Sequence, residues 1–388
     1  MREPTLNITL VAVHQAVSSV TVSGWRPAEA APLLLGQPPG AVVDMVGRLF
    51  TLCRVAQTVA TLDALEAALG IEAAPAVRAS RQALVLAEAL EQGALRLLLE
   101  APRLVGGAPE RDTLRAFVGQ LKAVAARAEV AGWNRLGGGP EARSRGGPPG
   151  VPPGLAGAVA DLEPMLEDLL LGGGRLPETT DQLATWSGQG LGARVVAQAA
   201  DEPPCPLPPP PGLDADLAEL GGVLGGPGAV GFLARPTWRG QARETGPLPR
   251  HARAPLIAHL INGGHLLVAR LLARLMDLWG ALADLRALAQ GAPAAPPMTC
   301  LESPGRALAA VETARGRLIH HVAVADGRVA GWRALPPTAW NFHPSGVLSR
   351  ALIGQPATDR AALERRAHLL ILALDPCLAY HLTVKEGG

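Results

Sequence analysis

Both ends of the chain carry the alternation of apolar and polar residues that is typical of half-buried strands. Residues 6–10 and 20–23 alternate with a period of two, which predicts an N-terminal hairpin. Near the other end, residues 318–324 and 329–333 flank Asp326-Gly327, a dipeptide that favours a two-residue hairpin turn. We therefore expect small antiparallel sheets from the N- and C-terminal parts of the chain.

Between these strands the apolar residues recur with the spacing of helices. Leucine and alanine repeat in this way over residues 42–69, which include Cys53, and over residues 79–99, which follow Pro75. A stripe of leucines predicts a long helix that ends at Gly291: Leu271, Leu275, Leu278, Leu282 and Leu285. The pattern as a whole predicts an α+β, mainly helical protein. By length alone, the 388 residues could form two or three domains or one large one.

A last helix is predicted between Asp359 and Pro376. Asp359 is a suitable N-cap, and the residues that follow place an apolar stripe on one face: Leu363, Ala367, Leu370 and Leu374. Proline cannot continue a helix, because it lacks the backbone N–H. Cys377 is therefore expected just beyond the helix end.

Two tracts interrupt the helical middle. Residues 137–154 are rich in glycine, proline and arginine, and residues 203–212 are nearly all proline. The chain contains 45 glycines and 36 prolines, well above ordinary usage, and much of the excess lies in such tracts. We expect both tracts to be flexible surface loops.

Composition narrows the class of protein. Hydrophobic residues make up 48% of the chain, enough for a core, and the formal net charge of +1 gives no basic face for nucleic acid. No uncharged apolar run reaches the roughly 18–20 residues of a membrane span. Four widely spaced cysteines form no disulfide framework, which fits a reducing compartment. We expect a cytoplasmic protein.

Familiar catalytic motifs are missing from the sequence. The glycine-rich run 221–231 lacks the Lys-Ser/Thr ending of a phosphate-binding loop. The chain contains neither H-E-x-x-H nor G-x-S-x-G. Hydrolysis is therefore not indicated.

Two incomplete cysteine motifs stand near opposite ends of the chain. Asp375-Pro376-Cys377 is followed by Tyr380, at the position where a second cysteine would complete a C-x-x-C metal pair. Cys53 is preceded, three positions earlier, by Phe50 in place of a cysteine. Half a metal site at each end predicts a chain that handles a metal without using it for turnover.

Four segments together resemble the nickel–iron hydrogenase large subunits. Residues 312–316, E-T-A-R-G, are similar to the E-A-P-R-G motif of that family, and residues 337–341, P-T-A-W-N, to its P-T-T-W-N motif. Residues 375–377 resemble the start of D-P-C-x-x-C-x-x-H, and residues 48–57 resemble R-I-C-G-V-C-x-x-x-H. The resemblance covers nearly the whole chain. It implies a single large-subunit-like domain over residues 1–388, with a central helical bundle.

The resemblance also shows which metal ligands have been lost. In that family four cysteines hold a nickel and an iron, and the iron carries carbonyl and cyanide ligands. This sequence departs from the pattern at four ligand or motif positions: Phe50, Gln57, Tyr380 and Thr383. Two remaining cysteines cannot supply the nearly complete thiolate set that nickel needs at such a site, so no nickel is expected.

The positions that would contact the iron ligands are better preserved. The family's cyanide-binding arginine and threonine correspond to Arg315 and Thr338, and a guanidinium and a hydroxyl suit a negatively charged acceptor. Cys53 and Cys377 are the candidate metal ligands. Cys53 matches a bridging, iron-side position and Cys377 a nickel-only one, so either Cys377 shifts to the iron or one thiolate holds it alone. The plain alternatives are buried inert thiols and a structural ion pair at Arg315.

A hydrogenase-like chain without the nickel ligands resembles the hydrogenase expression/formation proteins of the HupK/HoxV type. That group implies an accessory protein, not an enzyme. It would hold an Fe(CN)2(CO) unit transiently and deliver it to the immature hydrogenase large subunit. Its partners would be that subunit and the maturation proteins that supply the iron unit. The alternatives are a divergent nickel–iron hydrogenase or hydrogen sensor, and a metal-free chaperone of the large subunit.

Overall fold

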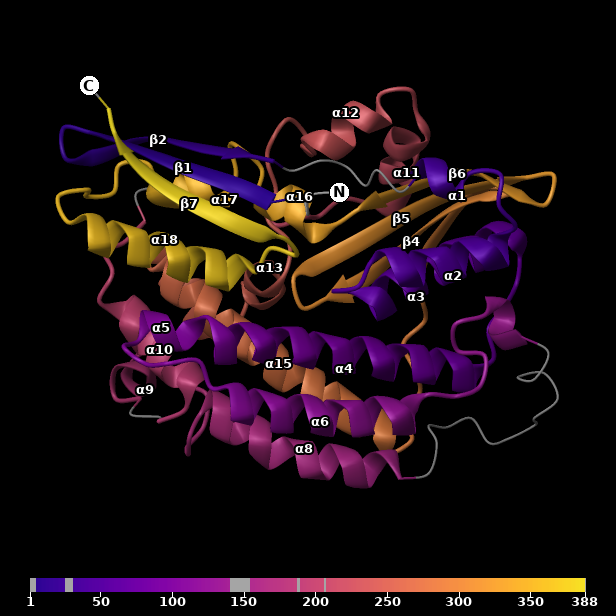
Figure 1. The fold of residues 1–388 in the computed structure, drawn as a ribbon, viewed down its shortest axis with the longest axis horizontal. Coiled ribbons are helices and arrows are strands. Elements are labelled where there is room, and N and C mark those ends of the chain that lie inside the picture. The colour runs from indigo at the N-terminus through magenta and orange to yellow at the C-terminus, as the bar shows by residue number, and fades with distance from the viewer. Residues whose placement is uncertain (1–4, 25–30, 140–153, 187–188, 206, 388) are drawn as a thin grey trace.

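The computed structural model describes residues 5–24, 31–139, 154–186, 189–205 and 207–387. Two small sheets lie side by side along one side of the molecule, and long helices pack beneath them (Figure 1). This arrangement of helices and separate sheets agrees with the predicted mainly helical α+β class.

The first sheet joins the two ends of the chain. It contains β1 (Thr5–Val13), β2 (Ala16–Ser23) and β7 (Ala379–Glu386) in the order β2-β1-β7. The predicted N-terminal hairpin is confirmed, since β1 and β2 pair antiparallel. β7 was not predicted from the sequence. It pairs parallel with β1 and begins two residues after Cys377. The ends of the chain therefore meet in one sheet.

The second sheet contains four antiparallel strands. They are β3 (Met298–Ser303), β4 (Arg306–Thr313), β5 (Gly316–Ala325) and β6 (Arg328–Leu335), in chain order. The predicted turn at Asp326-Gly327 joins β5 and β6, and both of its residues have the positive φ that such a turn requires. One face packs on α2 and α3, and the other is covered by α11 and α12.

The predicted helix over residues 42–69 is wrong in one respect, because it is two helices. α2 (Pro39–Leu49) ends before Phe50, and α3 (Arg54–Leu69) begins after Cys53. Phe50 and Cys53 are the two flanking residues, and neither has helical backbone angles. The break places the Cys53 thiol at a helix N-terminus instead of on a helix face.

The long helices form the lower layer in Figure 1. They are α4 (Pro75–Leu99), α6 (Arg111–Ala128), α8 (Leu155–Leu170) and α15 (Leu266–Ala289), and they bury one continuous apolar core. The leucine stripe predicted for α15 is buried, as expected. Above them, α18 (Arg360–Leu374) lies under the first sheet, and Asp359 caps it by accepting a hydrogen bond from the Ala362 N–H at 3.1 Å.

The other described helices are shorter: α1 (Ala31–Leu34), α5 (Ala101–Leu104), α9 (Thr180–Ala184), α10 (Leu191–Ala200), α11 (Leu217–Gly225), α12 (Ala229–Ala234), α13 (Pro247–His251), α14 (Pro255–Asn262), α16 (Pro337–Asn341), α17 (Val347–Leu352) and a 3-10 turn (Leu136–Gly138). In chain order, α9 to α14 lie between the long helices α8 and α15. No helix in the described ranges is long and apolar enough to span a lipid bilayer.

The two glycine- and proline-rich tracts differ in what the structure describes. Most of the first, residues 140–153, lies outside the described residues. The second forms neither helix nor strand in its described part, and the Pro208 carbonyl accepts a hydrogen bond from Arg350 Nε at 2.7 Å. The irregular backbone agrees with a loop, and its flexibility stays a prediction.

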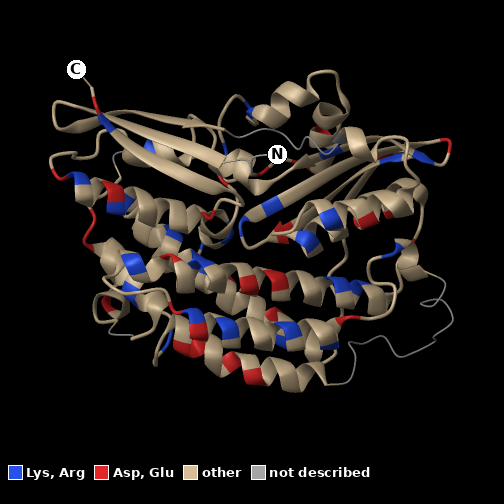
Figure 2. Ribbon diagram, viewed as in Figure 1, with Lys and Arg blue, Asp and Glu red and all other residues tan. Residues whose placement is uncertain are grey.

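Charges of both signs alternate along the helices (Figure 2). This view shows no continuous basic face of the kind that nucleic acid contacts, which agrees with the balanced net charge. The charges that organise the molecule are instead buried ones.

The close packing of α4 against α15 can be tested at Gly93. A Cβ atom added there would lie 2.3 Å from Leu278 Cδ2, whereas one added at Gly119 in α6 would meet no atom within 4 Å. Gly93→Ala is expected to destabilise the fold by about 1 kcal/mol net, because overpacking outweighs the gain in helix propensity. Gly119→Ala is expected to stabilise it by about 0.5–1 kcal/mol. Urea unfolding measures both, and changes of the same sign would contradict the packing.

Candidate functional site

The broken helix brings Cys53 close to Cys377. Cys53 is the N-cap residue of α3, and its thiol is half-buried. Burial raises the pKa of Cys53 to about 12, and the neighbouring Cys377 adds to the rise. The structure therefore brings together the two cysteines that the sequence picked as ligands, one from each end of the chain.

The DPC segment is fixed by a buried carboxylate. Asp375 ends α18 with a left-handed backbone (φ 50°), which turns the chain toward Cys377. Its carboxylate contacts Arg96 Nε at 2.5 Å, Arg274 Nη2 at 2.8 Å and Arg315 Nε at 3.2 Å. Burial alone would raise the pKa of Asp375, but the three guanidinium groups lower it to about 2. The carboxylate is thus charged at any ordinary pH.

Arginine also fixes the backbone of the same turn. Arg96 Nη2 donates to the Pro376 carbonyl at 2.6 Å, and Arg315 Nε donates to the Asp375 carbonyl at 3.1 Å. The last carbonyl groups of a helix have no hydrogen-bond donor within the helix. The arginines replace those partners and fix the direction in which Cys377 follows.

Thr338 positions the Cys377 thiol. It lies in the first turn of α16 and is almost fully buried. Its hydroxyl donates a hydrogen bond to Cys377 Sγ at 3.2 Å and accepts one from the Cys377 N–H at 3.4 Å. A hydroxyl has a single proton to donate. Contact with a cyanide, as the resemblance implies, therefore requires this proton to turn away from the sulfur.

Arg315 is an ion-pair partner, and it also has donor capacity left over. Besides its contacts with Asp375, its Nη2 donates to Gln92 Oε1 at 2.7 Å. Nη1 makes no hydrogen bond with any residue in the described part of the chain. The ion pair that was weighed as the alternative is thus present. It does not test the cyanide contact, which stays a prediction.

The neighbours of Arg315 fix its position within the E-T-A-R-G run. Gly316 has φ +131°, and an added Cβ atom would lie 2.9 Å from the Gly246 backbone nitrogen. Only glycine allows this close approach. The Arg315 carbonyl accepts a hydrogen bond from Asn341 Nδ2 at 3.1 Å, so Asn341 ties the second motif to the first.

Sequence reasoning missed a polar stripe on α4 that supports the site. Glu88, Gln92 and Arg96 are spaced four residues apart, so they lie on one face of the helix. Glu88 accepts hydrogen bonds from the Val55 and Ala56 N–H groups at 2.7 and 3.0 Å and caps α3 beside Cys53. Burial raises the pKa of Glu88 to about 7. The spacing of these polar residues in an Ala/Leu-rich helix could have revealed the stripe from the sequence alone.

Aromatic rings fill the two absent cysteine positions. The Phe50 ring packs against Trp332, with 6.0 Å between the ring centroids. Tyr380 lies in β7, and its hydroxyl is hydrogen-bonded to His368 Nδ1 at 2.9 Å. Burial raises the pKa of Tyr380 to about 12, so it remains a neutral phenol. Neither residue offers the site a sulfur ligand.

The other two altered positions lie apart from each other. Thr383 pairs with Thr9 in the middle of the β7–β1 ladder. Gln57 lies one turn after Cys53 on α3, and its Nε2 donates a hydrogen bond to Cys53 Sγ at 3.5 Å. Gln57 was predicted as a lost ligand position, and the structure shows it in contact with a retained one.

The site offers few protein ligands. Within the described ranges, no three histidine, cysteine, aspartate or glutamate side chains come together to hold a metal ion. Cys300 lies in β3 and Cys205 in the proline-rich tract, both half-buried. Any iron held here would depend on the thiols of Cys53 and Cys377 and on ligands that it brings with it.

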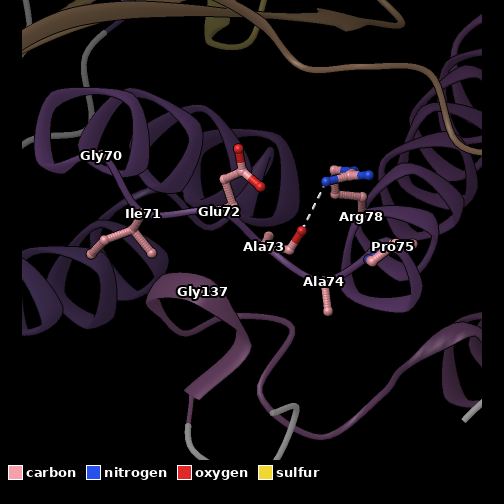
Figure 3. A pocket seen from close by; sticks show the side chains of 8 residues that line it. All are labelled: Gly70, Ile71, Glu72, Ala73, Ala74, Pro75, Arg78 and Gly137. Atoms are coloured by element: carbon pink, nitrogen blue, oxygen red, sulfur yellow. Dashed lines mark hydrogen bonds between the residues drawn. The ribbon is translucent and has the colours of Figure 1, made fainter. Parts of the chain in front are cut away.

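A surface cavity of about 550 Å³ lies elsewhere, at the turn between α3 and α4. Figure 3 shows Arg78 donating to the Ala73 carbonyl across one side of it, at 2.8 Å. Its lining contains no cysteine or histidine. Sixteen residues of α3 separate this turn from Cys53, about 24 Å at 1.5 Å per residue. The cavity is therefore separate from the cysteine site.

The Asp375 clamp predicts a defined loss of stability. Asp375→Asn leaves three guanidinium groups around a neutral amide, and we expect a loss of about 3–5 kcal/mol in the free energy of unfolding. Because the folded-state pKa is depressed, the carboxylate contributes stability above about pH 4 that is lost as the pH falls toward about 2. Urea unfolding over this pH range should show that slope in the wild type and not in the variant.

The matched control for this variant is Asp359→Asn. Asp359 is an exposed N-cap, and asparagine caps helices as well as aspartate does. Little change in stability is expected. Wild-type stability in Asp375→Asn would show that the clamp does not hold the fold.

Comparison with known proteins gives a consistent result. A scan against protein-family models finds no match. The hydrogenase expression/formation protein HoxV of Cupriavidus necator is 31% identical over 94% of this chain and 93% of its own length. HupK of Rhizobium leguminosarum is 30% identical over 99% and 97%, and the sulfhydrogenase 2 subunit alpha of Pyrococcus furiosus is 25% identical over 89% and 88%.

Solved structures confirm the predicted fold. The nickel–iron–selenium hydrogenase of D. vulgaris Hildenborough matches with a TM-score of 0.61 and 18% identity, over 96% of both chains. A NAD+-reducing nickel–iron hydrogenase matches with a TM-score of 0.56 and 16% identity, over 95% of this chain and 94% of its own. These matches show the fold, and the relatives at 30% identity or more show that the chain belongs to the hydrogenase expression/formation proteins that include HoxV and HupK.

Proposed function

We propose that this chain is an accessory protein of hydrogenase maturation that holds an Fe(CN)2(CO) unit as cargo and passes it to the immature large subunit. The observation that carries the proposal is the meeting of Cys53 and Cys377 beside Arg315 and Thr338. Membership in the expression/formation family supports the coarser role in maturation.

The ligands present suit an iron unit that brings ligands of its own. Three diatomic ligands and two thiolates leave one position of an octahedral shell open. A site that cannot complete the coordination shell is suited to binding the iron unit transiently. Nickel brings no such ligands, so two thiolates would bind it poorly.

Positive charge at the site favours an anionic cargo. Arg96, Arg274 and Arg315 surround one carboxylate, that of Asp375. Arg96 also pairs with Glu100, so these two carboxylates leave one of the three guanidinium charges unmatched. The nearby Glu88, with a pKa of about 7, offsets that charge only in part. That surplus would offset the charge of a cysteine thiolate, and the free Nη1 of Arg315 would donate to a cyanide nitrogen.

Delivery to the large subunit is supported by the common fold. The chain and the hydrogenases with known structure share one architecture over nearly their whole length. A maturation protein that supplies the iron unit could therefore dock on either in the same way. We propose the immature large subunit and such supplying proteins as the partners.

Infrared spectroscopy tests the proposal directly. Protein purified from a host with an intact maturation system should show carbonyl and cyanide stretching bands, and Cys53→Ala and Cys377→Ala should each lose most of the band intensity. Cys300→Ala is the control, because Cys300 lies in β3 outside the site, and it should keep the bands.

Other outcomes would support the competing functions. Absence of the bands in the wild type would contradict the proposal. Stoichiometric nickel or hydrogen-dependent dye reduction would indicate a divergent hydrogenase or hydrogen sensor. Full hydrogenase maturation in cells that carry the Cys53→Ala and Cys377→Ala double variant would indicate a metal-free chaperone.

A further inference from the structure

Gln57 occupies the position where the large-subunit motif ends in histidine, yet its side chain remains part of the site. Its amide nitrogen lies 3.5 Å from Cys53 Sγ, and its amide oxygen lies 2.8 Å from His320 Nε2. Gln57 is 4% exposed and His320 is fully buried. A side chain that spans two such partners has a restricted orientation.

His320 determines which way the Gln57 amide points. Thr61 Oγ1 lies 2.9 Å from His320 Nδ1 on the far side of the ring. If Thr61 donates to Nδ1, the proton of the neutral ring is on Nε2 and donates to Gln57 Oε1. The amide NH2 group then faces the sulfur. Thr61, His320 and Gln57 form a chain of hydrogen bonds that ends on Cys53.

The surroundings keep this chain neutral. The Trp332 ring packs edge-on against His320, with 4.9 Å between centroids, and Phe50 packs against Trp332 in turn. Burial lowers the pKa of His320 to about 3, so the imidazole is uncharged at ordinary pH. Phe50, at an absent cysteine position, thus helps to enclose the hydrogen-bond chain.

We propose that Gln57 is a positioning residue whose amide NH2 group, oriented by His320 and Thr61, donates a hydrogen bond to the Cys53 sulfur. The effect of this hydrogen bond on a bound iron unit rests on the proposed function. A donor on a metal-bound thiolate withdraws electron density from the sulfur and weakens its donation to iron. A neutral amide does so without adding a fixed charge, which suits a site that must release what it holds.

Alkylation of Cys53 in protein free of cargo tests the hydrogen-bond chain by itself. Site-resolved mass spectrometry would follow the reaction of Cys53 with iodoacetamide at a fixed pH. Gln57→Met keeps the length and removes the donor, so the thiolate is less stabilised. We expect the rate to fall about fivefold, which corresponds to about 1 kcal/mol.

Two threonine variants on the same helix give a graded comparison. Thr61→Val frees the His320 tautomer, so the Gln57 amide spends about half its time reversed and the rate falls about twofold. Thr58→Val is the matched control, because the Thr58 hydroxyl bonds the Arg54 carbonyl and takes no part in the chain. Its rate should equal that of the wild type. Circular dichroism would confirm that each variant is folded.

Infrared spectra of loaded protein give the second measurement. Without the donor, iron receives more electron density, so the carbonyl stretch of Gln57→Met should move to lower wavenumber. An alkylation rate in Gln57→Met equal to the wild type, or a Thr58→Val rate as slow as Thr61→Val, would overturn the inference. If the wild type shows no infrared bands, the proposed function fails. The order of the alkylation rates among the wild type and the variants still decides the role of Gln57.

Discussion

The buried Asp375 carboxylate is the interaction on which the site depends. It contacts Arg96 on α4, Arg274 on α15 and Arg315 in the β4–β5 turn, so one carboxylate joins three parts of the chain. A buried charge without partners is very costly in free energy. The carboxylate and the three guanidinium groups therefore depend on one another. Because Asp375 also ends α18 with a left-handed backbone, the same contacts set the direction of Cys377. The geometry of the proposed iron site is thus fixed by ion pairs that need no metal.

That independence explains how the fold tolerates the loss of cysteines. Where metal holds a site together, removing ligands exposes unmatched polar groups and loosens the surrounding loops. Here Phe50 packs on Trp332, and Tyr380 bonds His368, so each substituted position has its own packing or hydrogen-bond partner. Arg315 is held by Asp375 and Gln92 whether or not a cyanide is present. The fold can therefore exist without an iron unit, as the proposed function requires between uptake and delivery.

Much of the fold and most of the site residues could be predicted from the sequence. The hairpins, the α15 stripe and the Asp359 cap follow from local rules of spacing and capping, and the motifs identified Cys53, Cys377, Arg315 and Thr338. The break before Cys53 was missed, because leucine and alanine continue the helical spacing through it and the cause is tertiary: Glu88 on α4 caps the new helix start. β7 was missed because only its pairing with β1 makes the segment a strand. Gln57 was interpreted only as an absent ligand, since its partner His320 lies far away in sequence.

The hydrogen bonds at the two sulfurs suggest how binding and release of an iron unit can be balanced. Thr338 donates to Cys377 and Gln57 donates to Cys53, and both donors are neutral. The charged groups act one step further away, through Arg315 and the Asp375 clamp. A fixed positive charge in contact with a sulfur would keep it as a thiolate and favour tight binding of the metal. A neutral donor stabilises the thiolate by only about 1 kcal/mol. Under the proposed function, a site built in this way would orient the iron unit strongly and bind it weakly. That combination suits a protein that has to give the iron unit up to a large subunit with a complete set of cysteines.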